Sequence, residues 1–554
     1  MVCKTRKFMN SVTLHRFFFY FVSFVNYVDF SLWQGTLEVN MINSKRCRLA
    51  HSIWLAMAGL LAISPTLAAN ADSAISQMAT KVLPYQAKPR VFVLTDIGNE
   101  PDDQMSLTRF LLYANEMNVE GLVATTSTWQ REKVHTDMIK VVLNHYGEVQ
   151  PNLLKHAAGF PSQSQLAALV APGVEGYGLA ATGAGKHTTG SDLLMKAIEK
   201  STDAGNPLFI NLWGGANTLA QALKDLSVKH PKSMVNAVTQ NLVVYAISDQ
   251  DDAGFWVREN YPHITWIGDP SSQNGEDYAR STWTGISGDR YYRNAQGADF
   301  TTVSQHWLDE NIRSKGPMGK GYLQYLFIME GDTPAFLGLI RNGLNSERNP
   351  GWGGWGGRYI VRQPQHETRP YWSSGGDFYP GNPNASDTVK GIDGQQHTSN
   401  QATIWRWRED FQHDFAARME WGIKDYAAAN HNPQAVVNGD SGQGAVFLNA
   451  IVGETLEISA EGSKDPDGNQ LSYRWFLYPE AGSASSQPLK ENDVQGRRGE
   501  DNLQAPAVLA LGEAQLSHAK VKALRAGTEH LILAVTDNGT PSLTSYRRII
   551  INVK

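Results

Sequence analysis

Four carboxylic acids stand close together directly after one apolar stretch of the chain. Residues 90–94 have the apolar, β-branched character of a buried parallel strand. Within eight positions the chain then supplies these acids: Asp96, Glu100, Asp102 and Asp103. Crowded carboxylates repel one another unless a cation neutralises them, and a set of oxygen ligands favours Ca²⁺ or Mg²⁺ over Zn²⁺. The spacing therefore predicts a metal site, with an acidic start to the following helix as the alternative.

Strand and helix patterns alternate from residue 90 onward. We expect strands at residues 90–95, 119–125, 208–213, 242–247 and 264–267, and helices at residues 103–118, 134–146, 218–229 and 410–429. This βαβ order predicts an α/β domain with a mostly parallel sheet flanked by helices. Ligands of such sheets bind at the carboxyl ends of the strands, and Asp96 lies at such an end.

Three later segments carry further candidate residues. They are NLWGGANTLAQAL (residues 211–223, with Asn217), SDQDDAGFW (248–256, with Asp249) and MEGDTPAFLGLI (329–340, with Asp332). The first two segments follow expected strands, at the edge of the sheet where they can face a common pocket, whereas the third gains its place only from the family resemblance given below. Asn217 then shapes the pocket and Asp249 binds substrate hydroxyls. The alternatives are a glycine-containing turn with Asn217 as N-cap, and a turn-capping role for the acids around Asp249.

A glycine-rich segment presents two tryptophans. In NPGWGGWGGRY, residues 349–359, Trp352 and Trp355 are three positions apart. Glycines free the backbone, so the indoles can be displayed to stack on the C–H faces of sugars. A packed loop anchored by the two tryptophans is the alternative. The first interpretation makes these residues an outer carbohydrate-binding wall.

The acidic stretch TDIGNEPDD resembles the DxDxGxDD signature of the nucleoside hydrolases. The whole chain looks like the bacterial cellulose-binding proteins that carry a nucleoside-hydrolase-like domain. Two departures are visible: Thr95 and Asp96 keep the strand-end pair with only one acid, and the loop before Asp102 is longer by two residues. The resemblance implies a nucleoside-hydrolase-like fold with a mostly parallel sheet.

The same resemblance implies roles for individual residues. Asp96 would be both a Ca²⁺ ligand and the base for the attacking water, while Asp103, Asp332 and the backbone carbonyl of Trp213 would complete the metal site. Asp102 would contact sugar hydroxyls. A histidine commonly precedes the last aspartate in the nucleoside hydrolases and assists the departing base, whereas Gly331 stands there in this chain. That difference favours glycans or glycosides over purine nucleosides, because protonation of a nucleobase is a separate catalytic task.

The amino-terminal region predicts export. Residues 41–71 contain a basic start, an apolar run and small residues before Asn70, which is the pattern of a signal peptide cleaved after Ala69 or Ala71. Met41 is then the expected start, and residues 1–40 are a doubtful upstream extension; a membrane anchor at residues 17–33 is the competing interpretation. We expect a secreted or periplasmic mature protein without a membrane span. Both cysteines precede the cleavage point, which excludes disulfides and thiolate chemistry.

The carboxyl-terminal region has a different pattern. Short alternating strands at residues 455–460, 471–477, 530–535 and 547–553 are separated by turns such as DPDGNQ, which predicts an all-β immunoglobulin-like sandwich. AEGSKDPDGNQLSYRWF resembles polycystic-kidney-disease-like and cadherin-like modules, with Trp475 as the expected core indole. We therefore expect an α/β domain at residues 88–430 and a sandwich at residues 432–554 that folds on its own.

Two classes of function remain. A formal net charge of −5 provides no basic surface for nucleic acid, and 15 tryptophans with 50 glycines suit a carbohydrate partner. The first class is a calcium-dependent hydrolase of N- or O-glycosidic bonds, in which Asp96 activates water. The second is a non-catalytic cellulose- or polysaccharide-binding protein that uses the same pocket. Calcium content and turnover of a panel of sugars discriminate between them.

Overall fold

The computed structural model describes residues 73, 75–85, 88–269, 275–288, 291–292, 296–364, 367–374, 385–483 and 507–554. The expected upstream extension (residues 1–40) and signal peptide (41–71) lie outside the described residues. Within the described ranges, no helix has the length and apolar character needed to cross a membrane.

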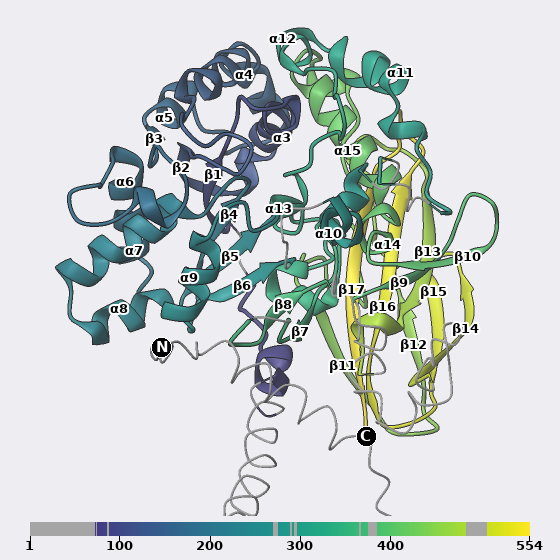
Figure 1. Cartoon of the computed structure of the whole chain (residues 1–554). Helices are drawn as coiled ribbons and strands as arrows, with labels where there is room; N and C mark the ends of the chain where they lie inside the picture. Colours follow the sequence, from purple (N-terminus) through teal and green to yellow (C-terminus); the bar gives the residue numbers. More distant parts are fainter. Residues whose placement is uncertain are drawn as a thin grey trace, which may run out of the picture. The chain divides into compact units, whose positions relative to one another are not determined.

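The amino-terminal part is built on one eight-stranded sheet with the strand order β3-β2-β1-β4-β5-β6-β8-β7 (Figure 1). Its strands are β1 (Arg90–Thr95), β2 (Asn118–Ala124), β3 (Val170–Pro172), β4 (Leu208–Leu212), β5 (Leu242–Ala246), β6 (Thr265–Gly268), β7 (Ile360–Arg362) and β8 (Tyr371–Ser373). All neighbours pair in parallel except β7, which is antiparallel to β8. The expected α/β fold with a mostly parallel sheet is confirmed.

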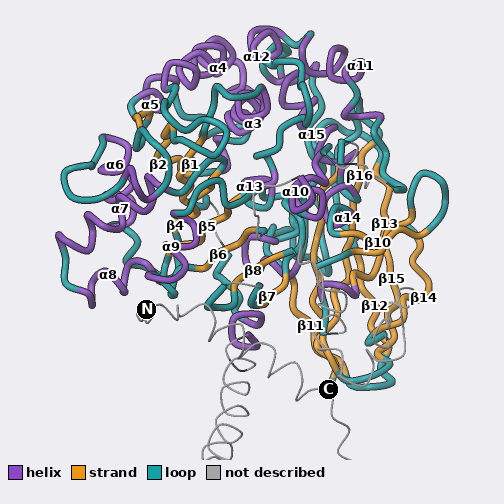
Figure 2. Tube along the Cα trace, viewed as in Figure 1, coloured by secondary structure: helices purple, strands orange, loops and turns teal. Residues whose placement is uncertain are grey.

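Helices cover both faces of this sheet, and Figure 2 shows the strands between two groups of helices. The helices are α3 (Pro101–Leu112), α4 (Thr136–His156), α5 (Gln163–Ala167), α6 (Thr189–Glu199), α7 (Asn217–Lys229), α8 (Lys232–Thr239), α9 (Ala253–Asn260), α10 (Gly275–Arg280), α11 (Gln305–Leu308), α12 (Gly316–Gly321), α13 (Pro334–Leu337), α14 (Ala402–Trp405) and α15 (Arg408–Trp421). Within β1, Val91 and Val93 pack into the core with α3 and α4, whereas Phe92 and Leu94 pack into the core with α6 and α7. Burial on both faces explains the continuous apolar sequence of the strand.

The carboxyl-terminal part forms the expected sandwich. One sheet has the order β11-β17-β16-β13 and the other the order β12-β15-β14. Their strands are β11 (Val446–Ala450), β12 (Thr455–Ser459), β13 (Leu471–Tyr478), β14 (Leu509–Gln515), β15 (His518–Ala523), β16 (Gly527–Asp537) and β17 (Thr544–Val553). Trp475 is buried in the core between the sheets, as predicted. A separate hairpin joins β9 (Asp387–Lys390) to β10 (Gln396–Ser399).

The sandwich does not stand apart from the α/β part. Tyr478, Ile532 and Tyr546 belong to the same hydrophobic core as α3 and α15. Arg548 of β17 is fully buried, and its guanidinium donates to the backbone carbonyl oxygens of Leu344 and Gly353. Residues 72–554 accordingly make one compact unit. Aromatic and basic side chains on the outer face of the β13–β16–β17 sheet thus pack against the α/β part, and independent folding of the sandwich stays a prediction.

A buried ion cluster ties the two parts together. Asp387 is fully buried, and its carboxylate receives Arg358 Nε at 2.7 Å and Arg406 Nη1 at 2.9 Å. The hydroxyl of Tyr478, at the end of β13, donates to the same carboxylate at 2.6 Å. Burial by itself raises the pKa of a carboxyl, but the two guanidinium groups hold the pKa of Asp387 below its ordinary value.

Candidate functional site

The acidic loop forms a well-defined turn between β1 and α3. Pro101 occupies the start of α3, where its missing N–H costs nothing, and Asp102 and Asp103 lie in the first turn. The Thr95 hydroxyl, at the end of β1, donates to Asp103 and accepts the Ile97 N–H at 3.1 Å. Strand end and helix start are thus fastened to each other, and the acids are fixed at the carboxyl edge of the sheet.

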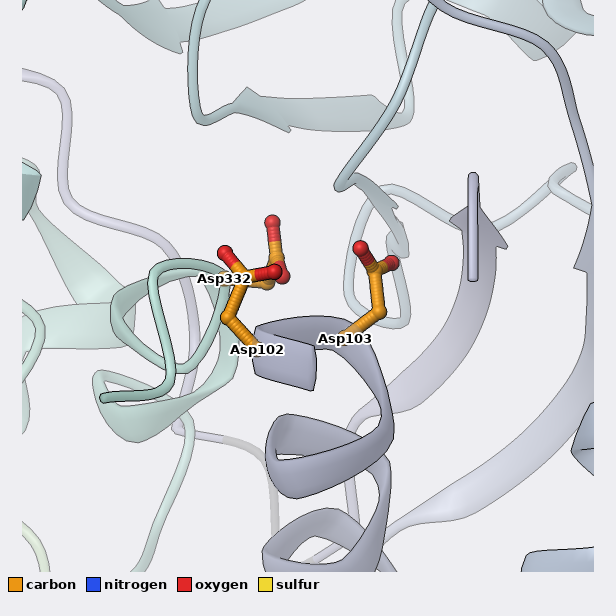
Figure 3. Close-up of side chains that lie close together, drawn as sticks. All are labelled: Asp102, Asp103 and Asp332. Atoms are coloured by element: carbon orange, nitrogen blue, oxygen red, sulfur yellow. The ribbon is translucent and has the colours of Figure 1, made fainter. Parts of the chain in front are cut away.

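Three carboxylates come together at this edge. Asp102, Asp103 and Asp332 each offer an oxygen, and these oxygens all lie within 4.8 Å of one another. Figure 3 shows Asp102 and Asp103 at the first turn of α3, with Asp332 beside them from the segment that leads into α13. The two sequence segments that carry them are more than 200 residues apart, so the fold itself makes the cluster.

The cluster lies in a cavity of about 490 Å³. Asp96 and Glu100 line the same cavity, so five carboxyl groups surround it. Asp96, Asp103 and Asp332 are each only 4% exposed, which places them at the protected end of the space. This volume is in the range of a small-molecule site.

Burial and mutual repulsion shift the acidities of these groups. Burial, with the charges of Glu100 and Asp96, raises the pKa of Asp102 to about 8. Burial also raises the pKa of Asp96 to about 6, and it raises those of Asp103 and Asp332 well above the ordinary value, with the neighbouring aspartates adding to the effect. Without a counterion, the site holds protons at pH values where exposed carboxyls are ionised.

The unpaired atoms of the site suit a hard cation. Among the described residues, Asp102 Oδ1, Asp332 Oδ2 and Gln250 Oε1 are buried and have no hydrogen-bond partner. A buried polar atom without a partner is costly, and these three are all oxygens of the cavity lining. An oxygen-only donor set of this kind fits Ca²⁺ or Mg²⁺. The residues present therefore fit a divalent metal ion.

The observed cluster differs in part from the predicted ligand set. It contains Asp103 and Asp332, adds Asp102, which was expected to contact sugar, and does not include Asp96. The carbonyl oxygen of Trp213 accepts a hydrogen bond from Gln250 Nε2 at 2.5 Å. Because the Gln250 amide nitrogen makes this contact, the amide oxygen of Gln250 is left without a hydrogen-bond partner. Gln250 was not among the predicted ligands, but it contacts the Trp213 carbonyl, which was.

A buried ion pair supports the cluster from behind. Arg109 of α3 and Glu330 are both fully buried, and Arg109 Nε lies 2.5 Å from Glu330 Oε2. The Thr333 hydroxyl donates to the same carboxylate at 2.9 Å, and Tyr322 also donates to it. Glu330 has a φ of 58°, which is strained for a residue with a side chain. The ion pair thus holds the segment with Asp332 in a fixed turn against the helix that carries Asp102.

Asn217 does not reach the cavity. Its side chain is fully buried, where its amide nitrogen donates to Thr126 Oγ1 at 2.9 Å and to the Gly176 carbonyl at 2.8 Å. Its oxygen accepts from Thr125 Oγ1 at 2.9 Å. The position of Asn217 therefore does not support the prediction that it shapes the pocket as a substrate-binding residue. Its amide joins the loop after β2 to the start of α7, because the close approach of these loops leaves backbone carbonyls that need a donor.

Asp249 is also removed from the cavity. Its two oxygens receive Arg258 Nη1 at 2.9 Å and Nη2 at 2.7 Å, and the same guanidinium pairs with Glu367 at 2.5 Å. Neighbouring Ser248 and Gln250 line the cavity, whereas Asp249 does not. This position does not support the predicted contact of Asp249 with substrate hydroxyls, because Arg258 engages both oxygens of its carboxylate.

The two tryptophans of the glycine-rich segment are structural. Trp352 is 6% exposed and Trp355 is 1% exposed. Trp352 packs edge-on against His530 of the sandwich, with ring centroids 5.6 Å apart, and Trp355 packs against Tyr546, with centroids 6.5 Å apart. The prediction of an exposed sugar-binding wall is wrong at these positions. The flexible glycines allow the indoles to fill the junction with the sandwich.

Aromatic residues from other loops surround the acidic cavity instead. Trp129, Tyr278, Trp283, Tyr291, Tyr292 and Phe327 all line it. Trp129, Tyr291 and Phe327 are each more than half exposed. The sequence contained one usable signal: Trp129 follows the end of β2 by five residues, on the edge of the sheet where ligands bind. Tyr291 and Phe327 follow no such strand and offered no signal of this kind.

Family comparisons agree with this geometry. Residues 90–359 match the family described as "Cellulose-binding Sde182, nucleoside hydrolase-like domain". Residues 455–553 match the family described as "Cellulose-binding protein Sde0182, C-terminal domain". No curated protein matches the chain.

One solved structure resembles the chain over most of its length. It is a nucleoside hydrolase-related hypothetical protein from Saccharophagus degradans that is associated with carbohydrate metabolism. The two are 31% identical with a TM-score of 0.67, over 84% of this chain and 100% of that one. The effector protein XOO4466 (10% identity, 62% of this chain and 95% of that one, TM-score 0.29) and human CDH23 EC21-23 (12% identity, 22% and 33%, TM-score 0.14) are too dissimilar to inform the fold. The chain therefore belongs to the family of cellulose-binding proteins that combine a nucleoside-hydrolase-like domain with a dedicated carboxyl-terminal domain.

Proposed function

We propose that this protein is an exported, calcium-dependent hydrolase of glycosidic bonds. The observation that carries the proposal is the cluster of Asp102, Asp103 and Asp332, in which Asp102 and Asp332 each have a buried oxygen without a hydrogen-bond partner, in a cavity whose mouth is aromatic. Acids bind hydroxyl groups and a hard cation, and rings bind the C–H faces of sugars. A carbohydrate has both hydroxyl groups and apolar C–H faces, so the acids and the rings of the cavity can bind the same ligand.

The metal ion in this proposal is Ca²⁺. Asp102, Asp103 and Asp332 would hold it, with the Gln250 amide oxygen and the Trp213 carbonyl as further oxygen donors. Bound calcium supplies positive charge that neutralises the acids and makes a water molecule more acidic. The donor set contains neither thiol nor imidazole, which favours calcium or magnesium over zinc.

The chain's own residues then perform the remaining tasks. Asp96 accepts the proton of the attacking water, and its pKa of about 6 leaves it ionised at neutral pH, yet more basic than an exposed aspartate. The carboxylates oppose the positive charge that develops on the sugar ring in an oxocarbenium-like transition state. Ile247 and Trp283 in the lining limit the access of bulk water.

The position before Asp332 favours glycans over purine nucleosides. A Cβ atom on Gly331 would lie 2.7 Å from Asp102 Oδ2 and 3.4 Å from the Trp283 ring. A histidine at residue 331 would therefore displace the acid beside it. The leaving-group histidine that nucleoside hydrolases commonly place here would thus require Asp102 to move, and a sugar leaving group does not require a nucleobase acid.

A binding protein without turnover is the second candidate. The observation in its favour is that both matched families are described as cellulose-binding. In that case the same acids and rings hold a cellulose-like chain, and the metal ion orders the acidic loop. Both candidates require the same carbohydrate partner and the same calcium site.

Export is part of the proposal. The segment at residues 41–71 has the sequence pattern of a signal peptide, so the mature protein begins near Asn70 or Asp72 and is secreted or periplasmic. Sequencing the amino terminus of protein recovered from the medium or the periplasm tests this. An intact Met1 on cytosolic protein would contradict it.

Turnover separates the two candidates. Wild-type protein and Asp96→Asn, both loaded with calcium, are assayed against neutral oligosaccharides, aryl glycosides, inosine and uridine. Calcium-dependent release of reducing sugar that disappears in Asp96→Asn supports the hydrolase. Equal binding by both proteins with no turnover supports the binding protein. Efficient cleavage of inosine would contradict the preference for glycans.

A further inference from the structure

We propose that the cavity takes the end of an uncharged oligosaccharide, and that Trp129 and Phe327 form an outer sugar-binding site at its mouth. The proposal rests on the proposed function, because it names the substrate class of the same site. Three observations support it: the charge of the lining, the position of the exposed rings, and the burial of the acids.

The lining repels anions. Five carboxyl groups face the cavity: Asp96, Glu100, Asp102, Asp103 and Asp332. Within the described part of the chain, no lysine, arginine or histidine lines it. One divalent ion offsets two negative charges, so the site stays acidic or protonated when it is loaded. A uronic acid, a sugar phosphate or a nucleotide would bring its own negative charge against this acidic lining, which offers no basic side chain to pair with it.

The exposed rings belong to a continuous aromatic band. Trp129 and Tyr278 have ring centroids 6.4 Å apart, and Tyr278 continues to Tyr292 at 6.5 Å. Tyr291 then contacts Tyr292 at 5.0 Å and Phe327 at 5.5 Å. The two ends of the band, Trp129 and Phe327, are 53% and 52% exposed. Exposed rings that are held in place by neighbouring rings suit stacking on a ligand that extends beyond the cavity.

The chemistry of this mouth suits a sugar better than a nucleobase. Leu326, Phe327 and Ile328 have no polar side-chain atom, and the Trp129 indole has a single donor. A nucleobase carries several edge donors and acceptors, which lose their hydrogen bonds against such a surface. A sugar can turn its C–H face to the rings while its hydroxyls stay in water or point to the acids.

The burial of the acids indicates that a chain end enters. An internal segment of a polymer needs an open groove along which its reacting bond stays accessible from both directions. Here Asp96, Asp103 and Asp332 are each 4% exposed, whereas the rings at the mouth are half exposed. The lining thus changes from buried acids to exposed rings, as expected for one terminal sugar inside and the next sugars outside.

Calorimetry with calcium-loaded, full-length mature protein tests the outer site. The ligands are glucose, cellobiose and cellotetraose, and the variants are Trp129→Ala and Phe327→Ala. Phe447→Ala is the matched control, because Phe447 on β11 is 50% exposed but does not line the cavity. We expect each mouth variant to lose about five- to tenfold in affinity for cellotetraose, little for glucose, and nothing in calcium affinity, since stacking contributes on the order of a kcal/mol per ring. Unchanged cellotetraose affinity in both variants would overturn the outer site.

Two further measurements test charge and chain end. Tetragalacturonate should bind at least tenfold more weakly than cellotetraose, and Asn99→Lys, which adds a cation at the lining, should narrow that difference. Equal affinity for both ligands would overturn the charge argument. On a longer soluble glucan the stoichiometry should stay at one protein per chain, whereas a stoichiometry that rises with chain length would overturn end binding.

The two proposals fail separately. If binding increases with oligosaccharide length and requires Trp129 and Phe327, but no turnover is measured, the hydrolase proposal is contradicted and the outer sugar-binding site is supported. Calcium-dependent turnover of glycosides that is indifferent to both ring variants leaves the hydrolase standing and removes the outer site.

Discussion

The molecule contains two buried groups of carboxylates with opposite surroundings. Asp387 is enclosed by Arg358, Arg406 and the Tyr478 hydroxyl, and these neighbours hold its pKa below the ordinary value despite burial. Asp103 and Asp332 are also buried and Asp102 is partly buried, but no basic side chain of the described residues lines their cavity, and the pKa of Asp102 is raised to about 8. The first group satisfies its charge within the protein. Among the described residues no basic side chain lines the cavity of the second group, which makes it the candidate functional site.

The largest effect is expected from breaking the satisfied group. Asp387→Ala leaves two buried guanidinium groups without their carboxylate, which should lower the free energy of unfolding by about 3–5 kcal/mol. Chemical denaturation measures this loss. Calcium affinity of the fraction that remains folded should not change, and a large loss of calcium binding would show that the two groups are not independent.

Breaking the ion pair between Arg109 and Glu330 should lower both the stability of the protein and its calcium affinity. Glu330→Gln removes the charge that faces Arg109, and we expect a loss of about 3 kcal/mol in stability. Since Glu330 also sets the turn that carries Asp332, calcium affinity should fall about tenfold as well. Denaturation and calcium calorimetry on the same samples give both values. Glu199→Gln, at a surface ion pair far along the sequence, is the control.

A substitution in the acidic cluster should not lower the stability of the metal-free protein, in contrast to Asp387→Ala. Asp332→Asn removes one of the mutually repelling charges, so the metal-free protein should be as stable as wild type or more stable. Calcium affinity should fall about a hundredfold, equivalent to about 2.7 kcal/mol. Isothermal calorimetry and thermal unfolding in a chelator test the pair of effects. A destabilised metal-free variant with normal calcium binding would reverse the comparison.

The smallest effect is a pH dependence of the metal-free protein. The pKa values of Asp96 and Asp102 are raised to about 6 and about 8, so the folded state binds protons that the unfolded state has released. Their contribution to stability is complete below the unfolded pKa near 4 and is lost as the pH rises through 6 to 8. The melting temperature of wild type relative to Asp102→Asn should therefore fall by about 1–3 °C between pH 5 and pH 8. Saturating calcium should abolish the difference, and a difference that persists in calcium would contradict this assignment.

The sequence predicted the sheet and the acids for the same reason. Parallel strands buried on both faces are recognisable as apolar runs, and their carboxyl ends meet at one edge, so Asp96 and Asp103 are found among the residues directly after β1. Asp332 needed the family resemblance, because it precedes a short helix and comes after no strand of the sheet. The contribution of Gln250 depends on a backbone contact with Trp213 that local sequence does not encode.

The aromatic residues were assigned to the wrong place for a physical reason. Glycines around Trp352 and Trp355 indicate that the indoles are free to move into position, but the position itself is set by strands that come almost 200 residues later. Burial of a side chain is a tertiary property whenever the covering element is distant in sequence. The rings that do surround the acids lie on loops without a repeating pattern, and only the folded chain brings them together.

The contact between Arg548 and Leu344 has a consequence for the order of folding. These residues are 204 positions apart, and Arg548 belongs to β17, which follows the other strands of the sandwich in the chain. The segment after Asp332 and α13 therefore remains without these hydrogen bonds until β17 has been synthesised. A chain without β17 lacks these contacts with a loop of the α/β part, so the segment after Asp332 and the sandwich are completed in one late step of folding rather than in two separate ones.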